Sequence, residues 1–140
     1  MKALVFVALA LAQTAAGAAD LSAECPLTLP EASVSVSAPT GWVGGPSRTF
    51  VRLTEYGMMA GAPETMTYLV PSRSKDGRIK GTLTWVFAAG DEKWLYCRYG
   101  GSNVIQVAKR LDDAATYCTI TRTSDKHGAI TRAAVACSAP

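Results

Sequence analysis

Alternation of apolar and polar residues with a period of two is the feature that most restricts how this sequence can fold. The segments that show it are residues 33–38, 49–56, 82–88, 93–99, 104–111, 117–122 and 129–137. They are rich in Thr, Val, Tyr and Trp, which favour strands. Because a strand turns successive side chains to opposite faces, each segment predicts a strand with one buried face.

Short polar turns separate these segments. Asp76-Gly77 is the strongest hairpin signal and joins residues 67–74 to residues 78–88. Residues 39–47 and 58–64 predict loops. Strands joined by short turns run antiparallel, so we expect a mainly β fold, with a single antiparallel sheet curled into a small barrel or sandwich.

Residues 104–115 fit two interpretations. Val104, Val107, Ala108 and Leu111 have helical spacing, and good helix formers follow them. The same segment also alternates with a period of two. We prefer a strand followed by a turn, and one short helix stays open as the alternative.

The first residues have the features of a secretory signal peptide: a basic start at Lys2, an apolar run over residues 3–12 and small residues before Ala18 and Ala19. The run is shorter than the about 20 residues that span a membrane. We expect a signal peptide at residues 1–18, cleavage near Ala18 or Ala19, and a single disulfide-stabilised β domain at residues 19–140. No stable membrane insertion is expected after cleavage.

The remaining cysteines are Cys25, Cys97, Cys118 and Cys137. An even number in an exported protein predicts two disulfides, with three pairings possible. We favour Cys97–Cys118, because both fall on apolar strand faces, together with Cys25–Cys137, which would tie the chain ends. The absence of a C-x-x-C motif speaks against a zinc or redox site.

Composition and charge exclude several functions. Hydrophobic residues make up 49% and charged residues 18%, which excludes a disordered chain. Without Lys2, 13 basic residues face 11 acidic ones, so nucleic acid is not an expected partner. His127 is the single histidine and lies in a predicted turn. Glu55, on an otherwise apolar strand face, is best interpreted as lying past the core edge. We predict no enzyme, no cofactor and no metal site.

Two groups of residues are candidates for a binding surface. The first is Trp94, Tyr96 and Arg98, on the outer face of their strand if its alternate residues face the core. These residue types are enriched at binding hot spots. If the sheet is covered on both sides, they instead form a second core layer, and both interpretations stay open.

The second candidate group is the set of basic residues around the 76–77 turn, which are Arg73, Lys75, Arg78 and Lys80. They could contact an anionic envelope polymer or an acidic partner. They could also simply keep a hairpin soluble and protect a sheet edge, which we prefer. Trp42, in a Gly-rich loop, is a further candidate, although packing beneath the loop is favoured.

Several short motifs occur in an order known from one family. They are Glu24-Cys25-Pro26, Gly41-Trp42, Tyr68-Leu69-Val70-Pro71, Trp85, Trp94-Leu95-Tyr96-Cys97-Arg98-Tyr99, and Leu111 followed by Cys118. In this order the chain resembles a family of small, mostly uncharacterised exported proteins of Gram-negative bacteria. The resemblance implies a periplasmic location and a non-enzymatic role.

We therefore expect a periplasmic binding protein, with an envelope protein as its partner. Its most concrete form is an inhibitor or immunity-type protein against an enzyme that acts in the envelope. The alternatives are a binder of a small ligand or anionic envelope polymer, and a structural envelope component.

Overall fold

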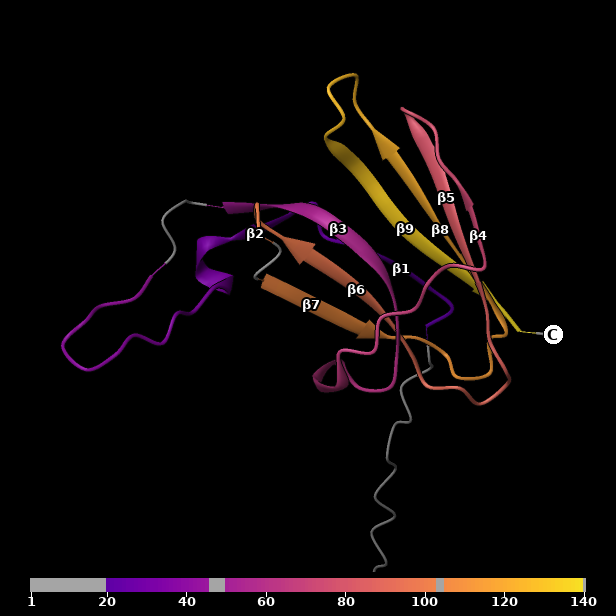
Figure 1. Ribbon diagram of the computed structural model, residues 1–140, viewed down its shortest axis with the longest axis horizontal. Helices are drawn as coiled ribbons and strands as arrows, with labels where there is room; N and C mark the ends of the chain where they lie inside the picture. The colour runs from indigo at the N-terminus through magenta and orange to yellow at the C-terminus, as the bar shows by residue number, and fades with distance from the viewer. Residues whose placement is uncertain (1–19, 46–49, 103–104, 140) are drawn as a thin grey trace, which may run out of the picture.

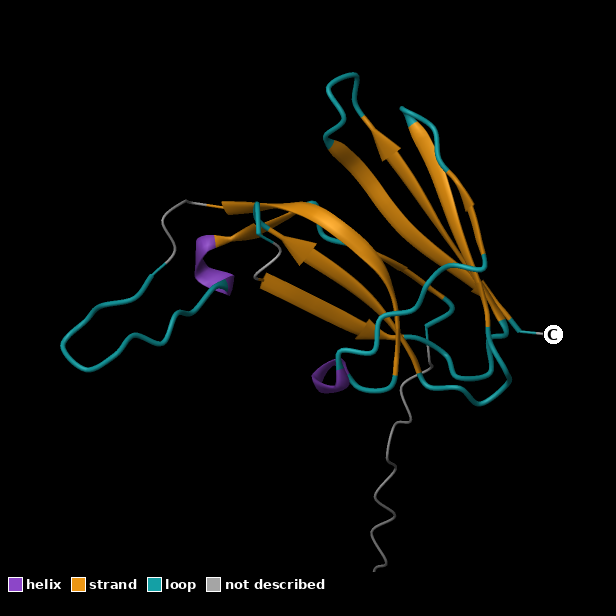
Figure 2. Ribbon diagram, in the orientation of Figure 1, coloured by secondary structure: helices purple, strands orange, loops and turns teal. Residues whose placement is uncertain are grey.

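The computed structural model describes residues 20–45, 50–102 and 105–139, so the predicted signal peptide lies outside the described residues. Strands are the main regular elements of the described residues, and loops connect them (Figure 2). These are β1 (Ser22–Glu24), β2 (Thr28–Pro30), β3 (Phe50–Ala60), β4 (Arg73–Lys75), β5 (Lys80–Val86), β6 (Lys93–Tyr99), β7 (Ile105–Arg110), β8 (Tyr117–Ser124) and β9 (Ile130–Ser138). Two single-turn 3₁₀ helices, η1 (Glu31–Ser33) and η2 (Pro63–Thr65), complete the described elements.

The strands form two antiparallel sheets that face each other. One has the order β1-β9-β8-β5-β4 and the other the order β2-β3-β6-β7. The sheets are close at one end and apart at the other (Figure 1). The predicted mainly β, antiparallel fold with two disulfides is confirmed, and its strands divide between two sheets.

The core lies between the two sheets. The four-stranded sheet contributes Leu95 and Tyr99, whose side chains are fully buried, and the five-stranded sheet contributes Trp85, Ile120 and Val135. This confirms the predicted inner face of residues 93–99. Burying one large apolar side chain stabilises a fold by about 1.5–3 kcal/mol, so these residues supply much of the driving force.

Three predicted segment boundaries are wrong. The first strand of the hairpin, predicted at residues 67–74, is only Arg73–Lys75, which is β4. In place of the loop predicted at residues 58–64, β3 continues through Ala60, because Met58 and Met59 pair with β6 and are fully buried. In place of the strand predicted at residues 33–38, η1 ends at Ser33 and irregular chain follows. The strand preferred for residues 104–111 is confirmed as β7, and a turn follows it.

The predicted disulfide pairing is wrong. The bonds join Cys25 to Cys97 and Cys118 to Cys137. Cys118 and Cys137 are direct partners in the β8–β9 register, with their Cα atoms 4.1 Å apart. Cys97 belongs to the other sheet and lies beside Cys25, with their Cα atoms 5.7 Å apart. Apolar alternation identifies the buried faces of Cys97 and Cys118 but not which strands are neighbours.

The N-terminal segment links the two sheets. β1 pairs with β9 in one sheet, and β2, three residues further on, pairs with β3 in the other. At the crossing, the Cys25 amide donates to the carbonyl of Ala133 and the Leu53 amide to the carbonyl of Leu27, each over 2.9 Å. The Cys25–Cys97 bond therefore fixes the crossing to the centre of β6.

The two disulfides should differ in their contribution to stability. Loop-closure entropy gives about 4.4 kcal/mol for the 72-residue separation of Cys25–Cys97 and about 3.2 kcal/mol for the 19-residue separation of Cys118–Cys137. We expect the double alanine variant at Cys25 and Cys97 to lose more unfolding free energy in urea than the matched variant at Cys118 and Cys137. Peptide mapping without reductant should recover both observed pairs; a Cys97–Cys118 peptide would contradict the assignment.

Candidate functional site

A cluster of aromatic and charged side chains covers the outer face of the four-stranded sheet. We call it the outer cluster; its members are Glu55, Tyr68, Tyr96, Arg98 and Gln106. They come from β3, β6, β7 and the chain just after η2. The latter segment is fixed along the end of β3, since the amide of Leu69 donates to the carbonyl of Met58 over 2.9 Å. Tyr68 is thereby held over Tyr96, with the two ring centroids 5.0 Å apart.

Hydrogen bonds join all members of the outer cluster. The Tyr96 hydroxyl donates to Oε1 of Glu55 over 3.1 Å, and Arg98 donates to Oε2 over 3.0 Å. Arg98 and the Tyr68 hydroxyl both donate to Oε1 of Gln106 over 3.0 Å. The Arg98 guanidinium also lies 4.1 Å from the centroid of the Tyr68 ring, a cation–π distance. These contacts fix each side chain in one position.

Gly57 makes the close packing of Tyr96 possible. The two residues are direct partners across β3 and β6. A Cβ atom at position 57 would lie 2.7 Å from the Tyr96 hydroxyl oxygen and 2.8 Å from its ring, closer than real Cβ contacts. The missing side chain therefore lets the ring lie across β3 and reach Glu55.

The structure resolves the position of the first predicted surface group. Tyr96 is only 8% exposed, and Trp94 and Arg98 are partly buried, with the Trp94 indole donating to Glu92 over 2.8 Å. These residues lie on the outer face, as predicted, but form a second packed layer there. Glu55 lies beyond the core, where Arg98 and Tyr96 bind its carboxylate. Whether a partner contacts their exposed parts stays a prediction.

Lys93 is a charged residue that sequence reasoning missed. Its side chain is fully buried at the start of β6, and its ammonium donates to the carbonyls of Asp112 and Asp113 over 3.3 and 2.8 Å. The ammonium also lies 5.1 Å from the centroid of the Phe87 ring. Burial lowers the pKa of Lys93, while the carboxylate of Asp113 acts in the opposite sense. Alternation places Lys93 on the same inner face as Leu95 and Tyr99, and it is the charge of the side chain that hides its burial.

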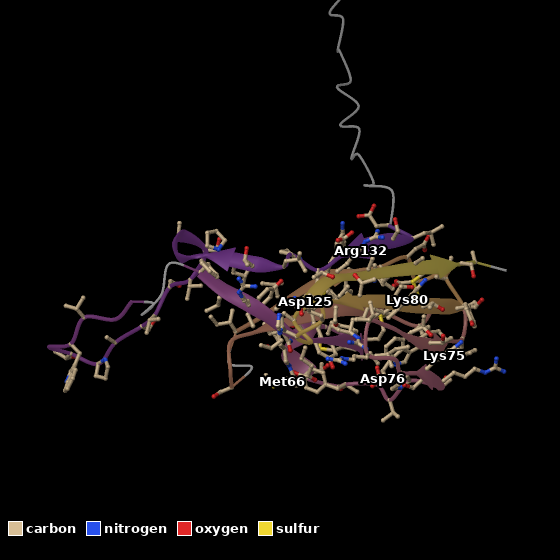
Figure 3. All side chains as sticks on the ribbon, turned by 90° about the horizontal axis from the view of Figure 1, so that it is seen from above. Met66, Lys75, Asp76, Lys80, Asp125 and Arg132 are labelled. Atoms are coloured by element: carbon tan, nitrogen blue, oxygen red, sulfur yellow. A yellow bond between two sulfur atoms is a disulfide. The ribbon has the colours of Figure 1, made fainter. Side chains whose placement is uncertain are left out.

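The basic hairpin residues are all exposed. Arg73, Lys75, Arg78 and Lys80 lie on β4, β5 and the turn between them, which confirms the predicted hairpin. Arg122 of β8 holds the turn by donating to Oδ1 of Asp76 over 2.7 Å and to the Gly77 carbonyl over 2.6 Å. Figure 3 shows Lys75 and Asp76 on the opposite side of the molecule from Arg132. The hairpin thus presents several cations to solvent.

Trp42 and the open end of the sheets offer further surface. Trp42 is 77% exposed, so the favoured packing beneath its loop is wrong.

Between the sheets, a groove of about 700 Å³ is lined mainly by apolar side chains, including Leu27, Phe50, Leu53 and Ile130. Arg52 stands at this groove with its guanidinium 5.6 Å from the centroid of the Phe50 ring.

The described residues contain no group of three or more His, Cys, Asp or Glu side chains that could hold a metal ion. His127 is exposed in the β8–β9 turn, where its amide donates to the carboxylate of Asp125 over 2.8 Å. In this part of the chain, no helix has the length and apolarity needed to cross a membrane.

The fold and surface define a class: a small, disulfide-linked β protein of two facing sheets. A family model described as "Type VI secretion system Tli immunity protein" matches residues 46–138, which include β3 to β9. The chain belongs to this family. No curated protein and no solved structure matches it. The family description agrees with the inhibitor or immunity type of function predicted from the sequence, and it names no partner.

We expect Gly57→Ala to destabilise the protein by about 1–3 kcal/mol, the usual cost of overpacking, because the added methyl group must displace Tyr96. The measurement is urea unfolding followed by tryptophan fluorescence. Gly101→Ala is the matched control, since a Cβ there has no atom within 4 Å. Equal stability of the two variants would contradict the role assigned to Gly57.

Stability should fall between pH 10 and pH 12. Burial, followed by the nearby Glu55 carboxylate, raises the pKa of Tyr96 to about 12, and burial raises the pKa of Tyr99 to about 12. The unfolded chain releases these protons near pH 10 while the folded chain retains them, so the stabilisation is complete below pH 10 and lost as pH rises to 12. Urea unfolding should show a shallower decline for Tyr99→Phe than for wild type. Equal declines would contradict this assignment.

Proposed function

We propose that this chain is a periplasmic immunity protein that binds a type VI secretion effector and blocks it without catalysis. The single observation that carries the proposal is the family match over residues 46–138. The matched residues include the outer cluster and the basic hairpin, and they form most of both sheets. The predicted signal peptide supports a site of action in the periplasm.

The build of the molecule suits inhibition by binding. Two disulfides and a hydrogen-bonded outer cluster hold the surface in one shape, and a preorganised surface loses little conformational entropy when a partner binds. The exposed cations Arg73, Lys75, Arg78 and Lys80 are proposed to attract an acidic face of the effector. Complementary charge mainly speeds association and selects the partner.

A competition assay tests the proposal while the effector is still unidentified. The gene is deleted from the strain that encodes it, and the deletion strain is grown on a surface with its parent. We expect the parent to kill the deletion strain, and to stop doing so when its type VI secretion is inactivated. Survival of the deletion strain beside a secretion-active parent would contradict the immunity function.

Complementation locates the protective activity. The full-length gene should restore survival, whereas a version that lacks residues 2–18 should not, because the protein would stay on the wrong side of the inner membrane. Mature, oxidised protein used as bait in an envelope extract should retain one effector in a stoichiometric complex. Protection by the leaderless version would argue against a periplasmic site of action.

The basic hairpin has its own test. Replacing Arg73, Lys75, Arg78 and Lys80 by Gln should slow association with the captured effector and reduce the salt dependence of its rate. Replacing Lys109 of β7, which forms an ion pair with Asp20, by Gln is a control for loss of positive charge elsewhere. Unchanged association of the hairpin variant would remove it from the proposed contact.

A further inference from the structure

Residues 32–45, which we call the arm, project from the body of the molecule (Figure 1). The arm lies between β2 and β3, whose outermost paired residues are Pro30 and Phe50. It precedes the residues that the family model matches. The β2–β3 pairing and the nearby Cys25–Cys97 bond fix the position from which the arm projects.

The arm is uncharged and carries large apolar side chains at its surface. None of its residues is Asp, Glu, Lys or Arg. Val43 is fully exposed, Trp42 is 77% exposed and Val36 is 49% exposed. Exposed apolar side chains gathered on a projecting segment are typical of protein contact sites, and Trp is among the residues most enriched at hot spots.

The tip of the arm has a defined shape. The Trp42 amide donates to the Pro39 carbonyl over 2.9 Å, which closes a tight turn, and Gly41 in that turn has a φ of +85°, the left-handed region that favours glycine. The arm has a first limb before this turn, which contains Val36, and a second limb after it, which contains Gly44. A Cβ at Gly44 would lie 2.7 Å from the Val36 carbonyl oxygen, so the two limbs approach as closely as a glycine allows. These constraints define the backbone turn that carries Trp42.

The first limb has the sequence of a strand but belongs to no sheet. Val34 and Val36 alternate with serines, and yet no strand is formed and no backbone hydrogen bond joins residues 34–38 to another described segment. Amides and carbonyls without a main-chain partner among the described residues are available for pairing with the edge of another sheet. A conflict between local preference and observed structure is expected where a segment serves binding.

We propose that the arm docks on the effector as an added strand: residues 33–38 pair with an exposed sheet edge, and Trp42 and Val43 enter an uncharged, apolar pocket beside it. This inference rests on the proposed immunity function and names the surface that performs it. The lack of charge on the arm matches a pocket without charges, because burying an unpaired charge would oppose binding.

The sheet edges of this protein make a second copy a poor acceptor for the arm. Of the four edge strands, β4 carries Arg73 and Lys75, and β7 carries Lys109 and Arg110. The other two, β1 and β2, are three residues long, and β2 ends at Pro30. Charged residues, Lys above all, discourage the pairing of edge strands. At β4 and β7 an uncharged arm would have to pair beside these cations, and β1 and β2 are too short to pair with six residues, so the effector is the favoured occupant.

Proline substitutions test the main-chain pairing. Adjacent amides of a strand point to opposite sides, so two variants are needed, Ser35→Pro and Val36→Pro. Ser35→Ala and Val36→Thr are the matched controls, since both retain the amide. The probe is the effector captured by the wild-type bait, and the measurement is its dissociation constant for each oxidised variant.

We expect one of the two proline variants, and Trp42→Ala, to weaken binding by about 30-fold or more, as at a hot spot, while the matched controls bind like wild type. Val86→Ala controls for loss of an exposed apolar side chain elsewhere, since Val86 is 65% exposed on β5. Unfolding midpoints should be unchanged, because the described residues of the arm make no sheet pairs. In the complex, hydrogen exchange of residues 34–38 should slow.

The outcomes separate the two proposals. Wild-type affinity in both proline variants and in Trp42→Ala, with protection intact, overturns the docking of the arm and leaves the immunity function standing. A wild-type protein that neither protects nor captures an effector overturns both. Proline variants that abolish self-association in sedimentation, while binding the effector normally, assign the arm to a second copy and overturn the inference as stated.

Discussion

The crossing of the N-terminal segment between the sheets is the constraint on which the rest of the structure depends. β1 completes one sheet and β2 completes the other, and only the short segment around Cys25 separates them. The Cys25–Cys97 bond fixes this segment to β6, a central strand of the four-stranded sheet. The residues that follow Cys25 line the groove at the open end of the sheets and lead through β2 to the base of the arm.

The four-stranded sheet is covered on both faces, by different chemistry on each. Its inner face packs apolar side chains against the other sheet, whereas its outer face carries ion pairs and aromatic rings. The outer polar groups bind one another, so Tyr96 is buried without an unsatisfied hydroxyl. The sheet therefore does not need a partner protein to cover its outer face, and contact can be made by segments that project beyond the two sheets.

Alternation along the chain predicts the elements better than the pairing between them. The inner face of β6, the β4–β5 hairpin and the strand β7 follow from local patterns. The disulfide pairing does not, because Cys118 and Cys137 meet only through the register of two strands. Alternation places Lys93 on the inner face of β6, but the groups that make its burial possible are main-chain carbonyls distant in sequence, which no local pattern reveals. The exposure of Trp42 escapes prediction for a related reason: a local pattern describes a segment's preference and not whether the fold supplies it with a neighbour.

The disulfide connectivity is consecutive: the first cysteine of the predicted mature chain joins the second, and the third joins the fourth. In a chain that crosses a membrane N-terminus first, the earliest two cysteines to emerge are then native partners. The remaining two also meet each other as the last strands arrive. Thiol oxidation in order of emergence therefore yields the native bonds, and the chain would not depend on an isomerase to correct them.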